Sequence, residues 1–310
     1  MSVRDLSKTT LDAFRKRAKE SRRLDSITLR ESARGLVEKL HLQDGSNLKR
    51  ATLLLFHSDP ERFVTGAHVK IGFFRTNADL VYHDEIHGNL FTQVEKTMEL
   101  LLTKYLKASI SYSGVQRVET LPVPEAALRE AVLNTIIHKD YASGTPIQIS
   151  VYDDKLMLWN PGRLPQDWTI AKLKAKHASR PFNPDVANAF FRAGMIEAWG
   201  RGIERMMEAC QTATVPEPDL RYESDGLWVE FRFSKSYIKG VKTTQEITQE
   251  ITQEKIIAFL RADPTLTRHE LAKKTGLTPD TIKYRLDKLR TAGIIRHIGP
   301  RKAGRWEVLK

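Results

Sequence analysis

The first part of the chain mixes helical and strand-like hydrophobic patterns. Apolar residues at helical spacing predict helical regions at Leu11–Lys19, Asp25–Leu40 and Leu90–Leu106. The continuous apolar run Ala51–Phe56 predicts a buried strand, and the alternating run Val69–Phe74 predicts another. We therefore expect residues 1–121 to form an α/β region. Because it has few strands for its length, we expect it to be an incomplete domain.

A second region begins after the proline-containing segment Leu121–Pro124, because proline suits the start of a helix. The apolar residues that follow predict a helix around Glu130. Alternating patterns then predict a strand pair with a turn at Asp153 and Asp154, two helices and a closing strand. In chain order these elements are Ile147–Tyr152, Lys155–Trp159, Asn183–Ala193, Gly202–Gln211 and Trp228–Phe233. We therefore expect these elements to form a second domain over residues 122–240.

Residues 241–252 repeat a Thr-Gln-Glu motif with a four-residue period. This period is close to that of a helix, so we expect a tether or a helix lead-in rather than a site. Residues 253–310 then carry the pattern of a winged helix-turn-helix. A first helix is expected at Gln253–Leu260, and Thr267 with Glu270 forms a capping box that opens a second helix.

The third helix and a wing complete this pattern. Thr278 caps the third helix, which begins at Pro279 and reaches Ala292. Residues 294–308 predict a two-stranded wing. The apolar positions can fill a small three-helix core, formed by Ile256, Ile257, Leu260, Leu271, Ala272, Leu277, Ile282, Leu286, Leu289, Ile294 and Ile295.

Composition narrows the classes of protein that fit. The 310 residues allow two or three domains, and 41% hydrophobic with 28% charged residues is ordinary for a globular protein. No apolar run approaches the roughly 20 residues that span a membrane. The N-terminus lacks a signal-peptide core, and Cys210 is the only cysteine, so the cytosol is favoured. Residues 241–310 hold 15 of the 50 basic residues against 8 acidic ones, as expected of a nucleic-acid-binding module.

A polar stripe runs along the predicted helix around Glu130. Glu130, Asn134 and His138 are four residues apart and lie on one helical face, whereas most other positions are apolar. An unpaired buried carboxylate is costly, so the stripe meets either solvent or a ligand. A carboxamide oxygen is a hard ligand for Mg²⁺, and a carboxylate can orient or deprotonate water. The stripe therefore suits Mg²⁺-nucleotide chemistry, with His138 as a structural residue bonded to the backbone or to Asp140.

Two glycine-containing blocks follow this helix, at residues 160–162 and 200–202. Glycines ahead of a helix let the backbone approach a phosphate, and a helix N-terminus favours negative charge. One such block is a weak signal, since it can also be a turn without a ligand. The polar stripe and the two glycine blocks occur in order, with a strand pair between the stripe and the first glycine block. Together they predict a nucleotide site more strongly than one glycine block alone.

A family resemblance is carried by three segments, EAALREAVLNTIIHKDY (125–141), NPGRLP (160–165) and GMIEAWGRGIER (194–205). Residues 122–235 are similar to the GHKL-type ATPase fold, in the branch found in RecG-like and Schlafen-type transcriptional regulators. The resemblance extends upstream through residues 49–56 and downstream into the winged helix. It implies an α+β chain, in which an α/β N-terminal region precedes a GHKL-like α/β sandwich and a winged helix-turn-helix. Relatives usually carry a further N-terminal domain, so a short member of the family is implied.

The same resemblance implies an ATP site with a lid. Its residues would be Glu130, Asn134, Asn160, Gly162, Gly200 and Gly202. Glu130 would act on water, Asn134 would hold Mg²⁺, and the phosphates would lie near the last two glycines. GHKL ATPases usually place an aspartate before spaced glycines to hold the adenine amino group. This chain has Asn160 there, so an uncharged amide oxygen would accept that hydrogen bond.

The winged helix offers basic and polar side chains to DNA. On the third helix the exposed candidates are Thr281, Lys283, Tyr284, Arg285 and Lys288. On the wing, the candidates for backbone phosphates are Arg296, Arg301, Lys302 and Arg305. A helix fits the major groove, where such side chains meet base edges and phosphates. The alternative is a winged helix used for dimerisation or protein contact.

Three functions fit this organisation. The first is a cytosolic transcriptional regulator that binds ATP and double-stranded DNA, in which nucleotide binding repositions the winged helices. A homodimer is expected for it, because such regulators often read paired half-sites. The second is an active Mg²⁺-dependent ATPase that acts on DNA, with Glu130 as the catalytic residue. The third is a non-catalytic scaffold with a degenerate nucleotide fold, which the departure at Asn160 favours.

Overall fold

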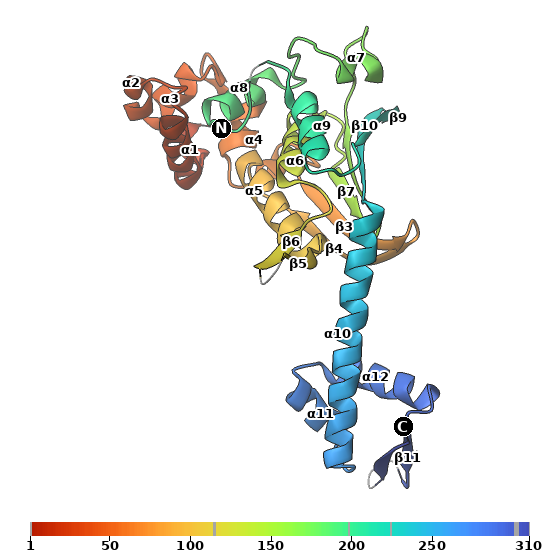
Figure 1. The fold of residues 1–310 in the computed structure, drawn as a ribbon. Helices are drawn as coiled ribbons and strands as arrows, with labels where there is room; N and C mark the ends of the chain where they lie inside the picture. The colour runs from red at the N-terminus through yellow and green to blue at the C-terminus, as the bar shows by residue number, and fades with distance from the viewer. Residues whose placement is uncertain (1, 114–115, 198, 224, 301–303, 310) are drawn as a thin grey trace. The chain divides into compact units, whose positions relative to one another are not determined.

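The chain folds into two compact units, Met1–Ile238 and Lys239–Lys310. The computed structural model describes residues 2–113, 116–197, 199–223, 225–300 and 304–309 (Figure 1). Each unit buries its own hydrophobic core. No helix of the described chain has both the length and the apolar character needed to cross a membrane.

The first unit combines helices with a large sheet. Its helices are α1 (Lys8–Ser21), α2 (Ser26–Arg30), α3 (Ala33–Lys39), α4 (Arg50–Phe56), α5 (Leu90–Leu100), α6 (Glu125–His138), α7 (Ile170–Lys174), α8 (Pro184–Arg192) and α9 (Gly202–Thr212). Its strands are β1 (Gln43–Asp44), β2 (Asn47–Leu48), β3 (Val69–Thr76), β4 (Asp79–Ile86), β5 (Ser109–Ser113), β6 (Gln116–Thr120), β7 (Ile147–Val151), β8 (Lys155–Pro161), β9 (Asp219–Glu223) and β10 (Gly226–Arg232). A π-helical turn, Leu101–Tyr105, extends α5.

A six-stranded sheet in the order β4-β3-β7-β8-β10-β9 forms the centre of this unit. Strands β3 and β7 are parallel, with Val69 opposite Ile147, and the other neighbours are antiparallel. Helices α5, α6 and α9 lie together on one side of the sheet (Figure 1), where α5 contacts β4 and α6 contacts β8. The result is an α/β sandwich, as the family resemblance implies.

The sheet draws strands from both sides of the boundary expected at residue 121. Strands β3 and β4 precede that residue, and the other four strands follow it. Residues 1–121 and 122–240 therefore share one sheet within the unit Met1–Ile238 instead of separating there. The end of this unit, by contrast, lies close to the boundary expected at residue 240.

Most predicted elements are confirmed, but the strand prediction for Ala51–Phe56 is wrong, because this run forms the helix α4. The run is rich in leucine, which is a good helix former, and it lacks the β-branched valine and isoleucine that favour strands. Thr52, Leu54, Leu55 and Phe56 are all buried, and α4 packs against both α5 and α8. A short helix enclosed on several sides needs no alternation of polar residues, so its pattern resembles that of a buried strand.

The second unit is a winged helix-turn-helix. Its elements are α10 (Lys235–Ala262, which begins in the first unit), α11 (Arg268–Thr275), α12 (Pro279–Thr291), β11 (Ile295–Ile298) and β12 (Arg305–Val308). The expected linker lies inside α10, so it is a helix lead-in. The capping box between Thr267 and Glu270 is present, and Thr278 accepts a hydrogen bond from the backbone N–H of Thr281. The predicted wing is the antiparallel pair of β11 and β12.

The core of this unit contains every apolar residue expected there. Eight of the eleven predicted residues are buried, and Ile257, Leu277 and Ile294 are partly buried against them. The sequence missed Leu266, Phe259, Trp306 and Val308, which also contribute. Trp306 and Val308 lie on β12, so the wing packs on the helices and completes a core that three helices alone would leave open.

Candidate functional site

A cavity of about 450 Å³ lies beside α6 and α9 in the first unit. Its wall includes all six residues predicted for the nucleotide site: Glu130, Asn134, Asn160, Gly162, Gly200 and Gly202. Helix α6 supplies the carboxylate and the first amide, the end of β8 supplies the second amide, and the third block leads into α9. Segments that are up to 72 residues apart in the sequence therefore meet at one place.

Gly202 brings the start of α9 against the polar stripe of α6. A Cβ atom at this position would lie 3.1 Å from Glu130 Oε2 and 3.1 Å from Asn134 Nδ2, which is a tight contact. The Arg201 side chain makes no capping hydrogen bond within the described chain. The first N–H groups of α9 therefore stand beside a carboxylate and an amide without a side-chain cap, as in helix N-termini that bind anions.

The amide of Asn134 lacks a partner in this cavity. Its Nδ2 atom is buried and has no hydrogen bond to any residue that the structure describes. A buried donor without a partner costs about 1–3 kcal/mol, so a ligand that accepts a hydrogen bond here would recover that cost. The unpartnered amide is therefore independent evidence of a binding site at the polar stripe.

Burial also changes the chemistry of the neighbouring carboxyl. It raises the pKa of Glu130 above its ordinary value, while the positive charges of Arg129 and Arg205 partly oppose the rise. A carboxylate with a raised pKa is a stronger base than an exposed one. A general base works best when its pKa approaches the working pH, so the shift suits Glu130 to accepting a proton from water.

His138 completes the stripe and also lines the cavity. Burial lowers the pKa of its imidazole to about 4, and the nearby His177 contributes to the shift. The ring is therefore neutral at pH 7. The expected hydrogen bond to the backbone or to Asp140 is not found among the described residues. The Asp140 carboxylate instead accepts a hydrogen bond from the backbone N–H of Ala142, 2.8 Å away, because it turns back on its own loop.

Two of the glycines are required by the backbone itself. Gly200 has φ +69°, and a Cβ atom there would lie 2.8 Å from the carbonyl oxygen of His177. A Cβ atom at Gly162 would lie 2.7 Å from the carbonyl oxygen of His138. Close approach of the chain thus explains both glycines, and it brings the buried Asn160 next to the end of α6.

Sequence reasoning missed one wall of the cavity. Residues 163–182, which connect β8 to α8 and contain α7, supply many of the lining side chains. Among them are Arg163 and Arg180, which make no ion pair within the described chain, and the aromatic residues Trp168 and Phe182. Guanidinium groups bind phosphate oxygens through paired hydrogen bonds. Arg163 directly follows the Asn160–Gly162 block, and this position in the sequence could have indicated that the segment lines the cavity.

On the winged helix, the predicted residues of α12 divide into two groups. Lys283, Tyr284 and Lys288 are exposed, as expected. Thr281 and Arg285 are half-buried, so the expectation that they are exposed is wrong. Thr281 is held by the capping interaction with Thr278. The Nε and Nη1 atoms of Arg285 are buried without a partner among the described residues.

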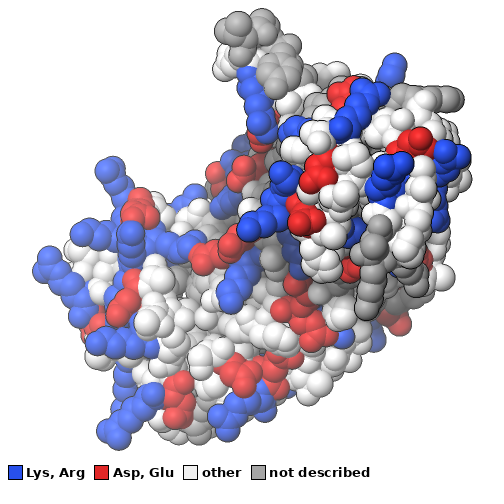
Figure 2. Space-filling model, turned by 90° about the horizontal axis from the view of Figure 1, so that it is seen from below, with Lys and Arg blue, Asp and Glu red and all other residues white. Residues whose placement is uncertain are grey.

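The wing and the surface charge complete the candidate DNA surface. Arg296 and Arg305 are exposed, and Arg296 pairs with Glu307 at 2.6 Å. Arg301 and Lys302 lie outside the described residues. On the face viewed from below, Lys and Arg side chains are interspersed with Asp and Glu side chains (Figure 2). The basic candidates for DNA contact that are exposed in the described chain are Lys283, Lys288, Arg296 and Arg305.

Comparisons with known proteins agree with this architecture. Residues 144–231 match a family model described as "Putative ATP-dependent DNA helicase recG C-terminal", and residues 249–296 match one described as "Winged helix-turn-helix DNA-binding". The first match begins after α6, so it includes the two glycine blocks but not Glu130 or Asn134. The chain thus has an ATPase-like domain followed by a winged-helix domain.

A solved structure with the same fold is the DIP2311 protein from Corynebacterium diphtheriae. It is similar over 99% of this chain with a TM-score of 0.62 and 18% sequence identity. This chain spans 62% of the length of that protein. At this identity the likeness shows the fold alone. No curated protein matches the chain.

Proposed function

We propose that this chain is a DNA-binding transcriptional regulator of the RecG-like and Schlafen-type branch, and that it binds ATP with Mg²⁺ in the cavity beside α6 and α9. The observation that carries the proposal is the convergence of Glu130, Asn134 and the two glycine blocks on that cavity. The proposed location of this regulator is the cytosol.

The residues of the cavity fit a Mg²⁺-nucleotide. Asn134 offers an amide oxygen of the kind that Mg²⁺ accepts, and its unpartnered nitrogen could donate to a phosphate. The N-terminus of α9 and the arginines of residues 163–182 suit the phosphates. Asn160 donates weakly from Nδ2 to the carbonyl oxygen of Pro161, 3.3 Å away, so its Oδ1 atom is left to accept from an adenine amino group.

The winged helix would supply DNA contact through α12. Its exposed Lys283, Tyr284 and Lys288 could enter a major groove, while Arg296 and Arg305 would contact phosphates. Helix α10 offers a physical route for control, because it contributes Tyr237 and Ile238 to the first core and Ile256 and Leu260 to the second. A nucleotide that shifts the start of α10 would change how the winged helix is presented. A homodimer on paired half-sites stays a prediction, which light scattering would test.

The test is calorimetric titration of the full chain with ATP and Mg²⁺. Asn134→Ala should lose at least tenfold in affinity, since a hydrogen bond to a charged group contributes about 1.5–3 kcal/mol. The matched control is Asn47→Ala, because Asn47 is exposed and lies outside the cavity. An electrophoretic shift of duplex DNA at low salt, with and without ATP, tests the proposed DNA binding. Wild-type chain that binds neither ligand would contradict the proposal.

A second candidate function is ATP hydrolysis. The observation that favours it is the raised pKa of Glu130, beside the amide that would hold Mg²⁺. Mg²⁺ would stabilise charge on the transferring phosphoryl group, while Glu130 would orient the water and take its proton. Glu130→Gln should then abolish hydrolysis and spare ATP binding. Hydrolysis at an unchanged rate in this variant would show that Glu130 is not the catalytic residue.

A further inference from the structure

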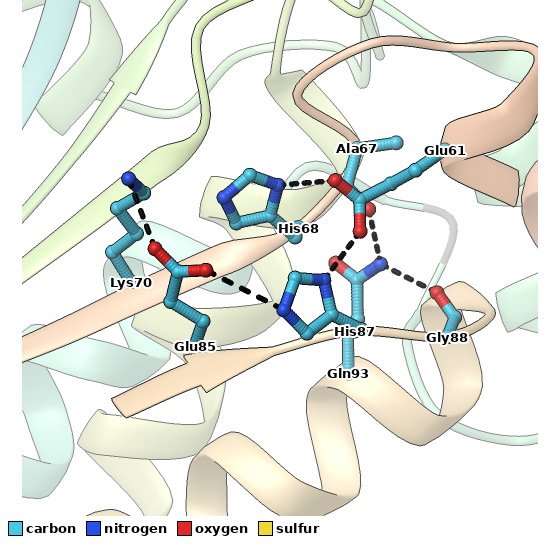
Figure 3. Close-up of polar contacts among 8 residues, drawn as sticks. All are labelled: Glu61, Ala67, His68, Lys70, Glu85, His87, Gly88 and Gln93. Atoms are coloured by element: carbon cyan, nitrogen blue, oxygen red, sulfur yellow. Dashed lines mark hydrogen bonds and ion pairs between the residues drawn. The ribbon is translucent and has the colours of Figure 1, made fainter. Parts of the chain in front are cut away.

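Two histidines and a glutamate converge at a second place in the first unit, away from the cavity. Glu61 lies in a short helical turn, Pro60–Arg62, while His68 directly precedes β3 and His87 directly follows β4 (Figure 3). One potential ligand atom from each side chain lies within 4.8 Å of the others. None of the three residues lines the cavity beside α6 and α9.

The glutamate brings the two imidazoles to one point. Glu61 Oε1 lies 2.6 Å from Nδ1 of His68, and Oε2 contacts Nδ1 of His87 (Figure 3). The two ring centroids are 5.1 Å apart. Both Nδ1 atoms therefore face a single carboxylate.

The backbone fixes this arrangement in advance. Val69 pairs with Ile86 at the end of the β3–β4 ladder, so His68 and His87 lie next to each other just beyond it. The buried side chain of Gln93 donates hydrogen bonds to the carbonyl oxygens of Ala67 and Gly88, at 2.6 and 2.7 Å (Figure 3). These two residues adjoin the histidines, so one amide holds both segments in place.

Outer partners also suit a bound ion. Nε2 of His87 lies 3.5 Å from Glu85 Oε2, and Glu85 Oε1 is held by Lys70 at 3.1 Å (Figure 3). A histidine that ligates through one ring nitrogen usually donates from the other to a carboxylate, which fixes its tautomer and orientation. The ring of His68 is mostly buried, and its Nε2 atom has no partner among the described residues. Glu61 is therefore the polar contact that holds this ring in the described chain.

We propose that Glu61, His68 and His87 bind a divalent transition-metal ion, of which Zn²⁺ fits best. Zn²⁺ takes imidazole nitrogen and carboxylate oxygen at about 2.0–2.2 Å in a tetrahedron, which sets ligand atoms about 3.3–3.5 Å apart. The shortest contact between ligand atoms would open by roughly 1 Å, and the longest would shrink by up to about 1.4 Å. Side-chain rotation can supply both changes. Three protein ligands leave one position for water.

The ligand set also separates this site from the nucleotide cavity. Mg²⁺ and Ca²⁺ prefer oxygen ligands, whereas imidazole suits Zn²⁺ and its first-row neighbours. An ion here would join the Pro60–Arg62 turn to the ends of β3 and β4. It would therefore stabilise the hairpin that forms one edge of the sheet, without any dependence on ATP.

The test is metal titration of the full chain after treatment with a chelator. Zn²⁺ binding is measured by calorimetry, and Co²⁺ is used as a probe because tetrahedral Co²⁺ has strong visible absorption. The expected result is one ion per chain, with affinity lowered at least tenfold by Glu61→Gln and by His68→Ala, and about tenfold by Glu85→Gln. His83→Ala is the matched control, because His83 is an exposed histidine of β4 outside the cluster.

Several outcomes would overturn the site. No stoichiometric binding by the wild-type chain would do so, and so would equal affinity in Glu61→Gln and the wild type. Displacement of Co²⁺ by millimolar Mg²⁺ would contradict an imidazole site. If His68→Ala does not fold, His87→Gln replaces it, because half of the His87 side chain is exposed and little packing is lost. Circular dichroism of each variant confirms the fold before titration.

Discussion

Gly202→Ala separates an effect on the proposed nucleotide site from an effect on the stability of the fold. The new Cβ atom would lie 3.1–3.3 Å from atoms of Glu130 and Asn134, so these side chains must move by a few tenths of an ångström. Gly202 does not have a positive φ, and it is the first residue of α9. The alanine therefore keeps the backbone and changes the polar pair that faces the cavity.

The two effects have different sizes. Alanine is favoured over glycine by up to about 1 kcal/mol in a helix, which offsets the crowding, so Tm should change by no more than about 2–4 °C. Displacing Asn134 from a phosphate or from Mg²⁺ would lose a charge-assisted hydrogen bond of about 1.5–3 kcal/mol. That loss corresponds to a Kd for ATP that rises about 10- to 150-fold.

Titration of ATP with Mg²⁺ and thermal unfolding of the same preparations provide the assay. Gly200→Ala is the contrasting variant, because φ +69° and the carbonyl oxygen of His177 at 2.8 Å predict that it lowers Tm. Equal ATP affinity in Gly202→Ala and wild type would refute a nucleotide between α6 and α9. A fall in Tm as large as that of Gly200→Ala would refute the packing argument instead.

Three further predictions follow from single residues. Gly66→Ala should lower Tm by several degrees, because φ is +71° and a Cβ atom would lie 2.2 Å from the carbonyl oxygen of Gly144. The pKa of His138 is about 4 in the folded chain and about 6.5 in the unfolded chain, so between these pH values only the unfolded chain binds the proton. As the pH falls from about 6.5 to 4, the free energy of unfolding should therefore fall by up to about 3 kcal/mol. Urea unfolding of His138→Phe should show a smaller fall in the free energy of unfolding over this pH range than the wild type. The same pH dependence in both proteins would contradict the prediction. Lys288→Ala should reduce the slope of log affinity for DNA against log salt by about 0.9, whereas Lys16→Ala should not.

The residues proposed for the nucleotide site could be gathered from the sequence because their signal is local. Glu130, Asn134 and His138 repeat at the helical period, and each glycine block adjoins a strand or a helix. The arginines of residues 163–182 were missed because that segment has no regular period. Their place in the cavity wall depends on how the loop returns from β8 to α8.

The His68 and His87 cluster could not be predicted for a different reason. Its residues are 7 to 26 positions apart with no metal-binding motif. They meet only because the register of β3 and β4 sets Val69 opposite Ile86. Likewise, the hydrophobic pattern of α4 is shared by a buried strand, and its leucine content and its packing against α5 and α8 distinguish the two.

The parallel pairing of β3 with β7 limits how the ATPase-like domain can be isolated. The matched segment 144–231 contains β7 but neither β3 nor β4. A fragment that begins at residue 122 would leave β7 as an open edge, with unpaired backbone groups between the buried residues Ile147 and Val151. Such an apolar edge recruits strands from other molecules. We therefore expect that fragment to aggregate, and the smallest well-behaved piece should begin before residue 69.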